Sequence, residues 1–135
     1  MSQVIDIDDY RAENKVTALS ASMTFAYNQQ FPYLIKEVLA PLSDIKSVET
    51  TIFDVLKYFS DPKISENRDT SNFFNYTNAT HISVNEDPNH LRHFELRFHY
   101  HKNNLRAEIL INIYTHDFTE KQNDDLLEYL YTLEK

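Results

Sequence analysis

Apolar and polar residues alternate between Leu91 and His116, and this pattern predicts a β-hairpin with two different faces. Successive side chains of a strand point to opposite faces of a sheet, so alternation separates a buried face from a solvated one. The apolar positions of the two strands are Phe94, Leu96, Phe98, Tyr100, Ala107, Ile109, Ile111 and Ile113. The polar positions are His93, Glu95, Arg97, His99, His101, Arg106, Glu108, Asn112 and His116. The hairpin should therefore place an apolar layer beneath a face rich in imidazole and mixed charge.

The hairpin can be given a register. A two-residue turn at Asn103 and Asn104 places Phe98 opposite Ile109 and His99 opposite Glu108. In this register every apolar residue faces another apolar residue, as cross-strand packing requires.

The second hairpin strand also carries two apolar residues, Leu110 and Tyr114, on the face that is otherwise polar. Strands that are apolar on both sides are usually covered on both sides, and an open strand edge favours pairing. Three segments or molecules could pack or pair with this strand: residues 16–27 folded as a strand, a second copy of the chain, or a foreign partner.

Helical spacing dominates the first sixty residues. Residues 8–27 fit either a helix or a strand, and the helix is favoured because Asp8 or Asp9 can cap it. A short helix is expected from Phe31 to Pro41, since proline is tolerated in a first turn and stops a helix at its end. Apolar residues at helical spacing predict a third helix from Ile45 to Phe59.

The remaining segments complete the expected order of elements. Residues 61–72 are polar and read as a loop, followed by a strand from Phe73 to Val84 and a turn at residues 85–89. Thr119 and Gln122 form the pattern of a capping box ahead of Leu126, Leu127, Leu130 and Leu133, which predicts a carboxy-terminal helix.

This order predicts one α+β domain over residues 1–135: an antiparallel β-meander of three or more strands, with N-terminal helices and a C-terminal helix packed on one face. A chain of 135 residues with 41% hydrophobic content is long enough to bury a single core.

Composition excludes several kinds of site. The chain contains no Gly, whereas phosphate-binding loops, dinucleotide-binding turns and the nucleophile elbow all depend on glycine. It also contains no Cys, which excludes disulfides and thiolate chemistry. The net charge of −8 disfavours direct binding of nucleic acid or of an anionic membrane. No secretory signal or membrane span is evident, so we expect a cytoplasmic location.

The histidines suggest two chemistries. His99 and His101 could share a metal ion with Glu108, but no third convincing ligand is present, and Arg97 and Arg106 would repel a cation. We therefore expect no metal and no cofactor. The histidines, with His81 and His93, could instead form a pH-responsive surface. A solvated polar face is the simpler interpretation of both patterns.

No motif specifies a reaction, so the sequence favours a non-enzymatic protein-binding module: an inhibitor, a toxin-neutralising immunity-type protein or an adaptor of bacterial or phage origin. The expected partner is another protein; the acidic net charge favours a cationic one, and a homodimer is an alternative. The expected contact residues are Arg97, His99, His101, Arg106, Glu108, Leu110 and Tyr114, with no catalytic residue. Two alternatives stay open: an acidic mimic of nucleic acid that blocks a DNA-binding protein, and a small metal-dependent enzyme that uses the His-x-His pair.

Overall fold

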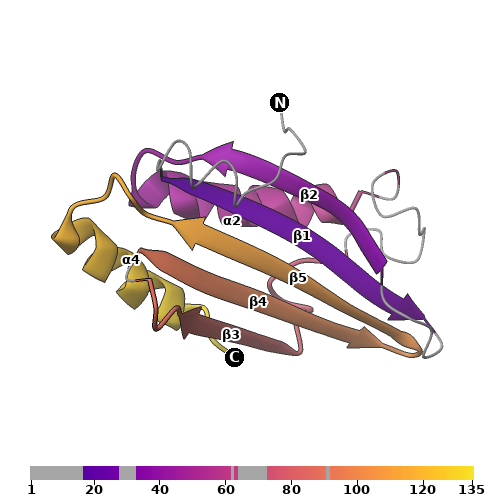
Figure 1. Cartoon of the computed structure of the whole chain (residues 1–135). Coiled ribbons are helices and arrows are strands. Elements are labelled where there is room, and N and C mark those ends of the chain that lie inside the picture. Colours follow the sequence, from indigo (N-terminus) through magenta and orange to yellow (C-terminus); the bar gives the residue numbers. More distant parts are fainter. Residues whose placement is uncertain (1–16, 28–32, 62, 64–72, 91) are drawn as a thin grey trace.

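The computed structural model describes residues 17–27, 33–61, 63, 73–90 and 92–135. Its centre is a five-stranded sheet in the order β2-β1-β5-β4-β3, in which every pair of neighbouring strands is antiparallel (Figure 1). The strands are β1 (Ala18–Tyr27), β2 (Tyr33–Pro41), β3 (His81–Glu86), β4 (His93–Lys102) and β5 (Leu105–Tyr114). The helices are α2 (Ile45–Phe59) and α4 (Glu120–Thr132). The α+β class expected from the sequence is confirmed.

The hairpin of β4 and β5 has the predicted register. Phe98 pairs with Ile109 and His99 pairs with Glu108, and the chain turns at Asn103 and Asn104. Asn103 adopts a φ of 54°, in the left-handed region that asparagine tolerates better than most residues. In a chain without glycine, asparagine at this position allows the tight connection.

The prediction of a helix over residues 8–27 is wrong for residues 18–27, which form β1; residues 8–16 lie outside the described part of the chain. β1 pairs with β2 on one side and with β5 on the other, so its backbone hydrogen bonds are made within the sheet. Its alternate residues Leu19, Ala21, Met23 and Phe25 are buried. Of the three candidates considered to pack or pair with the second hairpin strand, a strand within residues 16–27 is the one observed, and it pairs with the edge of β5 without covering Leu110.

The helix expected from Phe31 to Pro41 is also wrong: residues 33–41 form β2, and residues 31 and 32 lie outside the described part. β2 pairs along its length with β1, from Tyr33 opposite Phe25 to Pro41 opposite Ala18. A nine-residue segment gains little from an isolated helix. The pairing with β1, which a local pattern does not reveal, decides its conformation.

Both helices predicted from Ile45 and from Thr119 are present with capping boxes. Asp44 and Ser47 cap α2, and Thr119 and Gln122 cap α4. One core cluster joins buried residues of α2, of α4 and of the inner side of the sheet. Figure 1 shows α2 running behind β1 and β2, with α4 near the ends of β3 and β4.

The strand expected from Phe73 to Val84 begins only at His81. Residues 73–80 form turns in which the Asn78 N–H donates to the Asn75 side chain over 2.8 Å. Phe73 and Phe74 are nevertheless buried in the core. Local hydrogen bonds of asparagine compete with a strand, and here they prevail.

The outer edge of β3 is covered by the last residues of the chain. Lys135 and Ile82 exchange backbone hydrogen bonds of 3.1 and 3.4 Å, and the Val84 N–H donates to the Glu134 carboxylate over 3.2 Å. These contacts satisfy groups that an edge strand otherwise offers for pairing with another chain.

Candidate functional site

The side of the sheet opposite the core, called here the outer face, carries the residues of functional interest. Along β4 the burial alternates residue by residue, with Phe94, Leu96, Phe98 and Tyr100 buried. Between them stand partly exposed polar residues. The outer-face side chains on the central strands are Ser20, Ser22, Thr24, His93, Glu95, Arg97, His99, His101, Arg106, Glu108, Leu110, Asn112 and Tyr114.

An ion-pair network lies at the centre of the outer face. The Arg97 guanidinium contacts the Glu108 carboxylate at 2.5 Å and the Glu95 carboxylate at 3.5 Å. These three side chains are about one-third exposed, between 30% and 33%. Partly solvated pairs contribute little to stability, roughly 0 to 1 kcal/mol each, so the network orients its charged groups more than it stabilises the fold.

Histidines extend the network toward the β4–β5 turn. The His99 Nδ1 atom lies 3.7 Å from a Glu108 carboxylate oxygen, and the His99 ring lies 5.5 Å from the His81 ring on β3. His101 pairs across the strands with Arg106, and both are exposed. The predicted site residues Arg97, His99, His101, Arg106 and Glu108 therefore share one surface.

The two apolar members of the predicted site differ. Leu110 is half-buried on the outer face, in register with Ser22 on β1 and with Arg97 on β4. Tyr114 is only 4% exposed because the His93 ring stacks on it, with a centroid distance of 4.5 Å and an interplanar angle of 13°. Leu110 is accessible as an apolar contact, whereas Tyr114 supports the face from beneath His93.

His93 links Tyr114 to the β3–β4 loop. One ring nitrogen lies 3.0 Å from the Asp87 carboxylate and the other lies 2.8 Å from the Asn112 side-chain oxygen. The hydrogen bond with His93 lowers the pKa of Asp87 below its ordinary value of 3.8, and the Asn89 N–H lowers it further. The arrangement fixes the orientation of the imidazole.

We expect this contact to make stability depend on acid pH. Because the pKa of Asp87 is lower in the folded state, its contribution is present above pH 3.8 and is lost as the pH falls through the folded value. NMR titration of the Asp87 carboxyl should give a midpoint below 3.8, and His93→Gln should raise it. A midpoint unchanged by His93→Gln would contradict the contact.

The described residues contain no group of three or more His, Asp or Glu side chains placed to hold a metal ion. His99 and Glu108 lie close together, but Arg97 occupies the other side of the carboxylate. Neighbouring cations of this kind oppose the binding of another cation.

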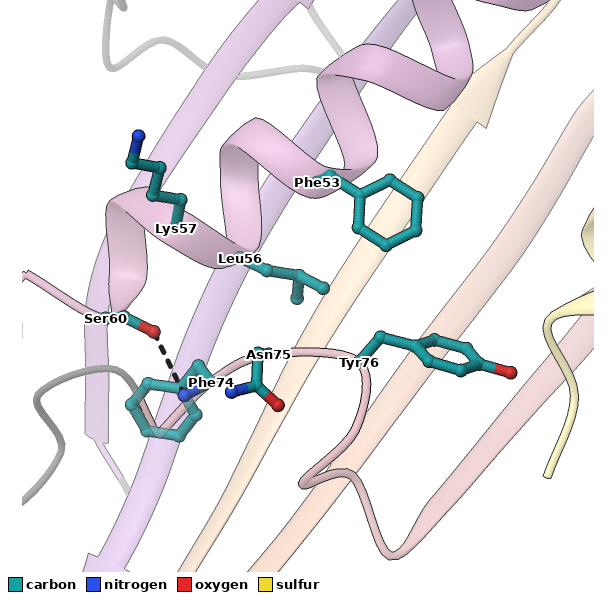
Figure 2. Close-up of a pocket in the computed structure, with 7 residues that line it drawn as sticks. All are labelled: Phe53, Leu56, Lys57, Ser60, Phe74, Asn75 and Tyr76. Atoms are coloured by element: carbon teal, nitrogen blue, oxygen red, sulfur yellow. Dashed lines mark hydrogen bonds between the residues drawn. The ribbon is translucent and has the colours of Figure 1, made fainter.

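A pocket lies away from the outer face, between α2 and the turns at residues 73–76 (Figure 2). Its volume is about 160 Å³, and it is lined by Phe53, Leu56, Lys57, Ser60, Phe74, Asn75 and Tyr76. The Ser60 hydroxyl accepts a hydrogen bond from the Phe74 N–H over 3.0 Å, which ties the end of α2 to the turns.

Sequence reasoning did not find this pocket or the contacts of His93. The pocket was missed because residues 73–80 were read as a strand, although Asn75 and Asn78 are spaced as turn residues. The outer-face residues of β1, Ser20, Ser22 and Thr24, were missed because a helix was favoured there. The alternation of Leu19, Ala21, Met23 and Phe25 was the signal for them.

The described residues form an α+β fold with a polar sheet face. Comparison with known proteins adds no assignment, since no family model, no curated protein and no solved structure matches the chain. Within the described residues, neither helix has the length and apolar character needed to cross a lipid bilayer.

Proposed function

We propose that the chain is a non-enzymatic protein-binding module that acts by stoichiometric binding through the outer face, as an inhibitor, an immunity-type protein or an adaptor. The observation that carries this proposal is the arrangement of Arg97, Glu108 and Leu110 at the middle of the sheet. Two oriented charged groups beside a half-buried leucine resemble the polar and apolar mixture of protein interfaces.

The size of the outer face fits this role. Five strands at a spacing of about 4.8 Å, with a length of about 33 Å for ten residues and less for the six-residue β3, give roughly 700 Å². A standard interface buries about 800 Å² on each partner. Because the strands are paired through a continuous ladder, the backbone beneath these side chains is ordered before binding, which lowers the entropic cost of association.

The net charge of the whole chain, −8, supports a cationic partner, whereas the outer face itself is balanced, with Arg97 and Arg106 against Glu95 and Glu108. Long-range attraction of this kind accelerates encounter with a protein of opposite charge, and a rise in salt concentration should slow the association.

The test uses the purified chain as bait in native extract, followed by reconstitution with the captured protein. Arg97→Glu and Leu110→Asp should each weaken binding of that protein at least about tenfold, since both disturb the centre of the interface. Glu128→Arg, an exposed charge reversal on α4, is the matched control and should leave the affinity unchanged. Thermal unfolding of each variant verifies that it is folded.

Light scattering should then give a complex of fixed stoichiometry. Two results would overturn the proposal: a captured protein that binds Arg97→Glu and Leu110→Asp as tightly as the unmodified chain, or one that the chain alters chemically with turnover.

A further inference from the structure

Three histidines lie together at the end of the outer face nearest the β4–β5 turn. His81 on β3 is in register with His99 on β4, and His101 follows two residues later on the same face of β4. We infer that this histidine cluster makes the outer face a pH-sensitive contact, which holds a cationic partner at neutral pH and releases it in mild acid. The inference rests on the proposed function, since it names the regulation of the same surface.

The three imidazoles are close enough to act as one charged patch. The ring centres of His81 and His99 are 5.5 Å apart, with an interplanar angle of 35°. His99 and His101 stand two residues apart on one strand face, a spacing of about 7 Å. His81 and His101 are exposed, and the His99 side chain is 38% exposed, so protons reach all three rings from solvent. Imidazole side chains in general gain a proton between about pH 5 and 7, which adds positive charge to the surface that a partner meets.

Charged groups of β4 and β5 border the histidine cluster. Arg106 is in register with His101, and Glu108 is in register with His99. The His99 Nδ1 atom lies 3.7 Å from one Glu108 carboxylate oxygen, while the Arg97 guanidinium binds the other oxygen. A protonated His99 therefore shares this carboxylate with a cation that is already bound. The carboxylate cannot neutralise further protons on the cluster.

The other elements beside the histidine cluster leave this charge uncompensated. The Glu134 carboxylate is bound to a backbone N–H of β3, and the Lys135 ammonium is bound to three backbone carbonyl oxygens. The Lys102 ammonium lies over an aromatic ring, 5.7 Å from its centre. On β1, the neighbouring residues Thr24 and Ala26 carry no charge. Within the described part of the chain, the one ion pair of the cluster is therefore that with Glu108.

Protonation changes the charge that the outer face presents. Without protons on the histidine cluster the face is balanced, with Arg97 and Arg106 against Glu95 and Glu108. Three imidazolium groups give it a positive excess, and like charges placed across an interface oppose association. A cationic partner, which the acidic net charge of the chain attracts, is therefore repelled at the contact itself. Proton binding and partner binding then oppose each other reciprocally.

The change of charge is measured first in the isotope-labelled free chain, by NMR relaxation with two dissolved nitroxide probes, one carrying a carboxylate and one carrying an amine. A positive patch attracts the anionic probe and repels the cationic one. At the backbone amides of His99, His101 and Arg106, the ratio of the anionic to the cationic probe effect should rise at least about twofold between about pH 7.5 and about pH 5.5. The triple variant with His81→Gln, His99→Gln and His101→Gln should lose this rise.

The second measurement is calorimetric titration of the captured protein at both pH values and constant ionic strength. Its affinity for the unmodified chain should fall at least about tenfold at about pH 5.5, and its affinity for the triple variant by less than about twofold. His90→Gln is the matched control: it removes a histidine from the β3–β4 loop, outside the strands of the sheet, and should keep the full decrease. Thermal unfolding at both pH values verifies that each variant is folded.

The outcomes separate this inference from the proposed function. The inference is overturned by a probe ratio that does not rise, by an equal rise in the triple variant, or by an affinity that acid leaves unchanged or changes equally in the triple variant. If Arg97→Glu and Leu110→Asp still weaken binding at neutral pH, such a result leaves the proposed function standing. The probe measurement needs no partner, so it tests the histidine cluster even where capture fails.

Discussion

Phe98→Ala should lower the free energy of unfolding by about 3 to 5 kcal/mol, the range for removing a buried phenylalanine. Phe98 is 0% exposed, lies in register with Ile82 on β3 and Ile109 on β5, and stacks against Tyr100 at 6.5 Å. Alanine would leave a cavity among rigid strands that cannot collapse to fill it. Urea denaturation of the variant and of the unmodified chain measures the difference.

The neighbouring residue provides the control. Arg97→Ala changes the same strand one position earlier, on the outer face, and removes ion pairs that are about one-third exposed. It should cost about 1 kcal/mol or less. Equal losses at Phe98 and Arg97 would contradict the assignment of the two faces.

Ser22→Pro is expected to have the second-largest effect, on the order of 3 kcal/mol, by analogy with the cost of proline inside a helix. Ser22 lies in β1 between two strands, opposite Glu37 on β2 and Leu110 on β5. Proline removes a backbone donor from this ladder and is tolerated mainly at edges. Thermal and urea unfolding both measure the decrease in the free energy of unfolding.

Ser22→Val is the matched substitution, since valine keeps the donor and favours an extended backbone. It should change stability by no more than about 0.5 kcal/mol. A proline variant as stable as the valine variant would show that β1 is not an inner strand.

The success of the hairpin prediction has a physical cause. Every second residue is apolar from Phe94 to Tyr100 and from Ala107 to Ile113, and one turn fixes the register. The pairing partners are close in sequence, so the local pattern contains almost all the information. The outer-face positions of Arg97, His99 and Glu108 followed directly from that alternation.

β1 and β2 were assigned wrongly because their partners are distant in sequence. The segment fits a strand through the alternation of Leu19, Ala21, Met23 and Phe25, but it also fits a helix. The local sequence pattern does not distinguish the two structures. The conformation of this segment is decided by its pairing with the edge of β5, a strand distant in sequence. Pairing with β1 likewise overrides the helical spacing in β2.

The site was only partly predictable for the same reason. Tyr114 was expected as an exposed anchor, but its burial depends on stacking with His93, whose orientation depends on Asp87 in a loop. The pocket beside Phe53 depends on turns closed by Asn75 and on contacts from Tyr100 and Lys135. Contacts between distant loops of this kind leave no periodic signal in the sequence.

The central claim, that the outer face binds the partner, is tested most directly by cysteine protection. The chain has no Cys, so one introduced thiol is the only site for a maleimide reagent. Glu95→Cys on β4 and Glu128→Cys on α4 are compared in the free chain and in the purified complex. The account predicts that the partner slows labelling at position 95 at least about tenfold and leaves position 128 unaffected. Protection at position 128 with position 95 still reactive would contradict it.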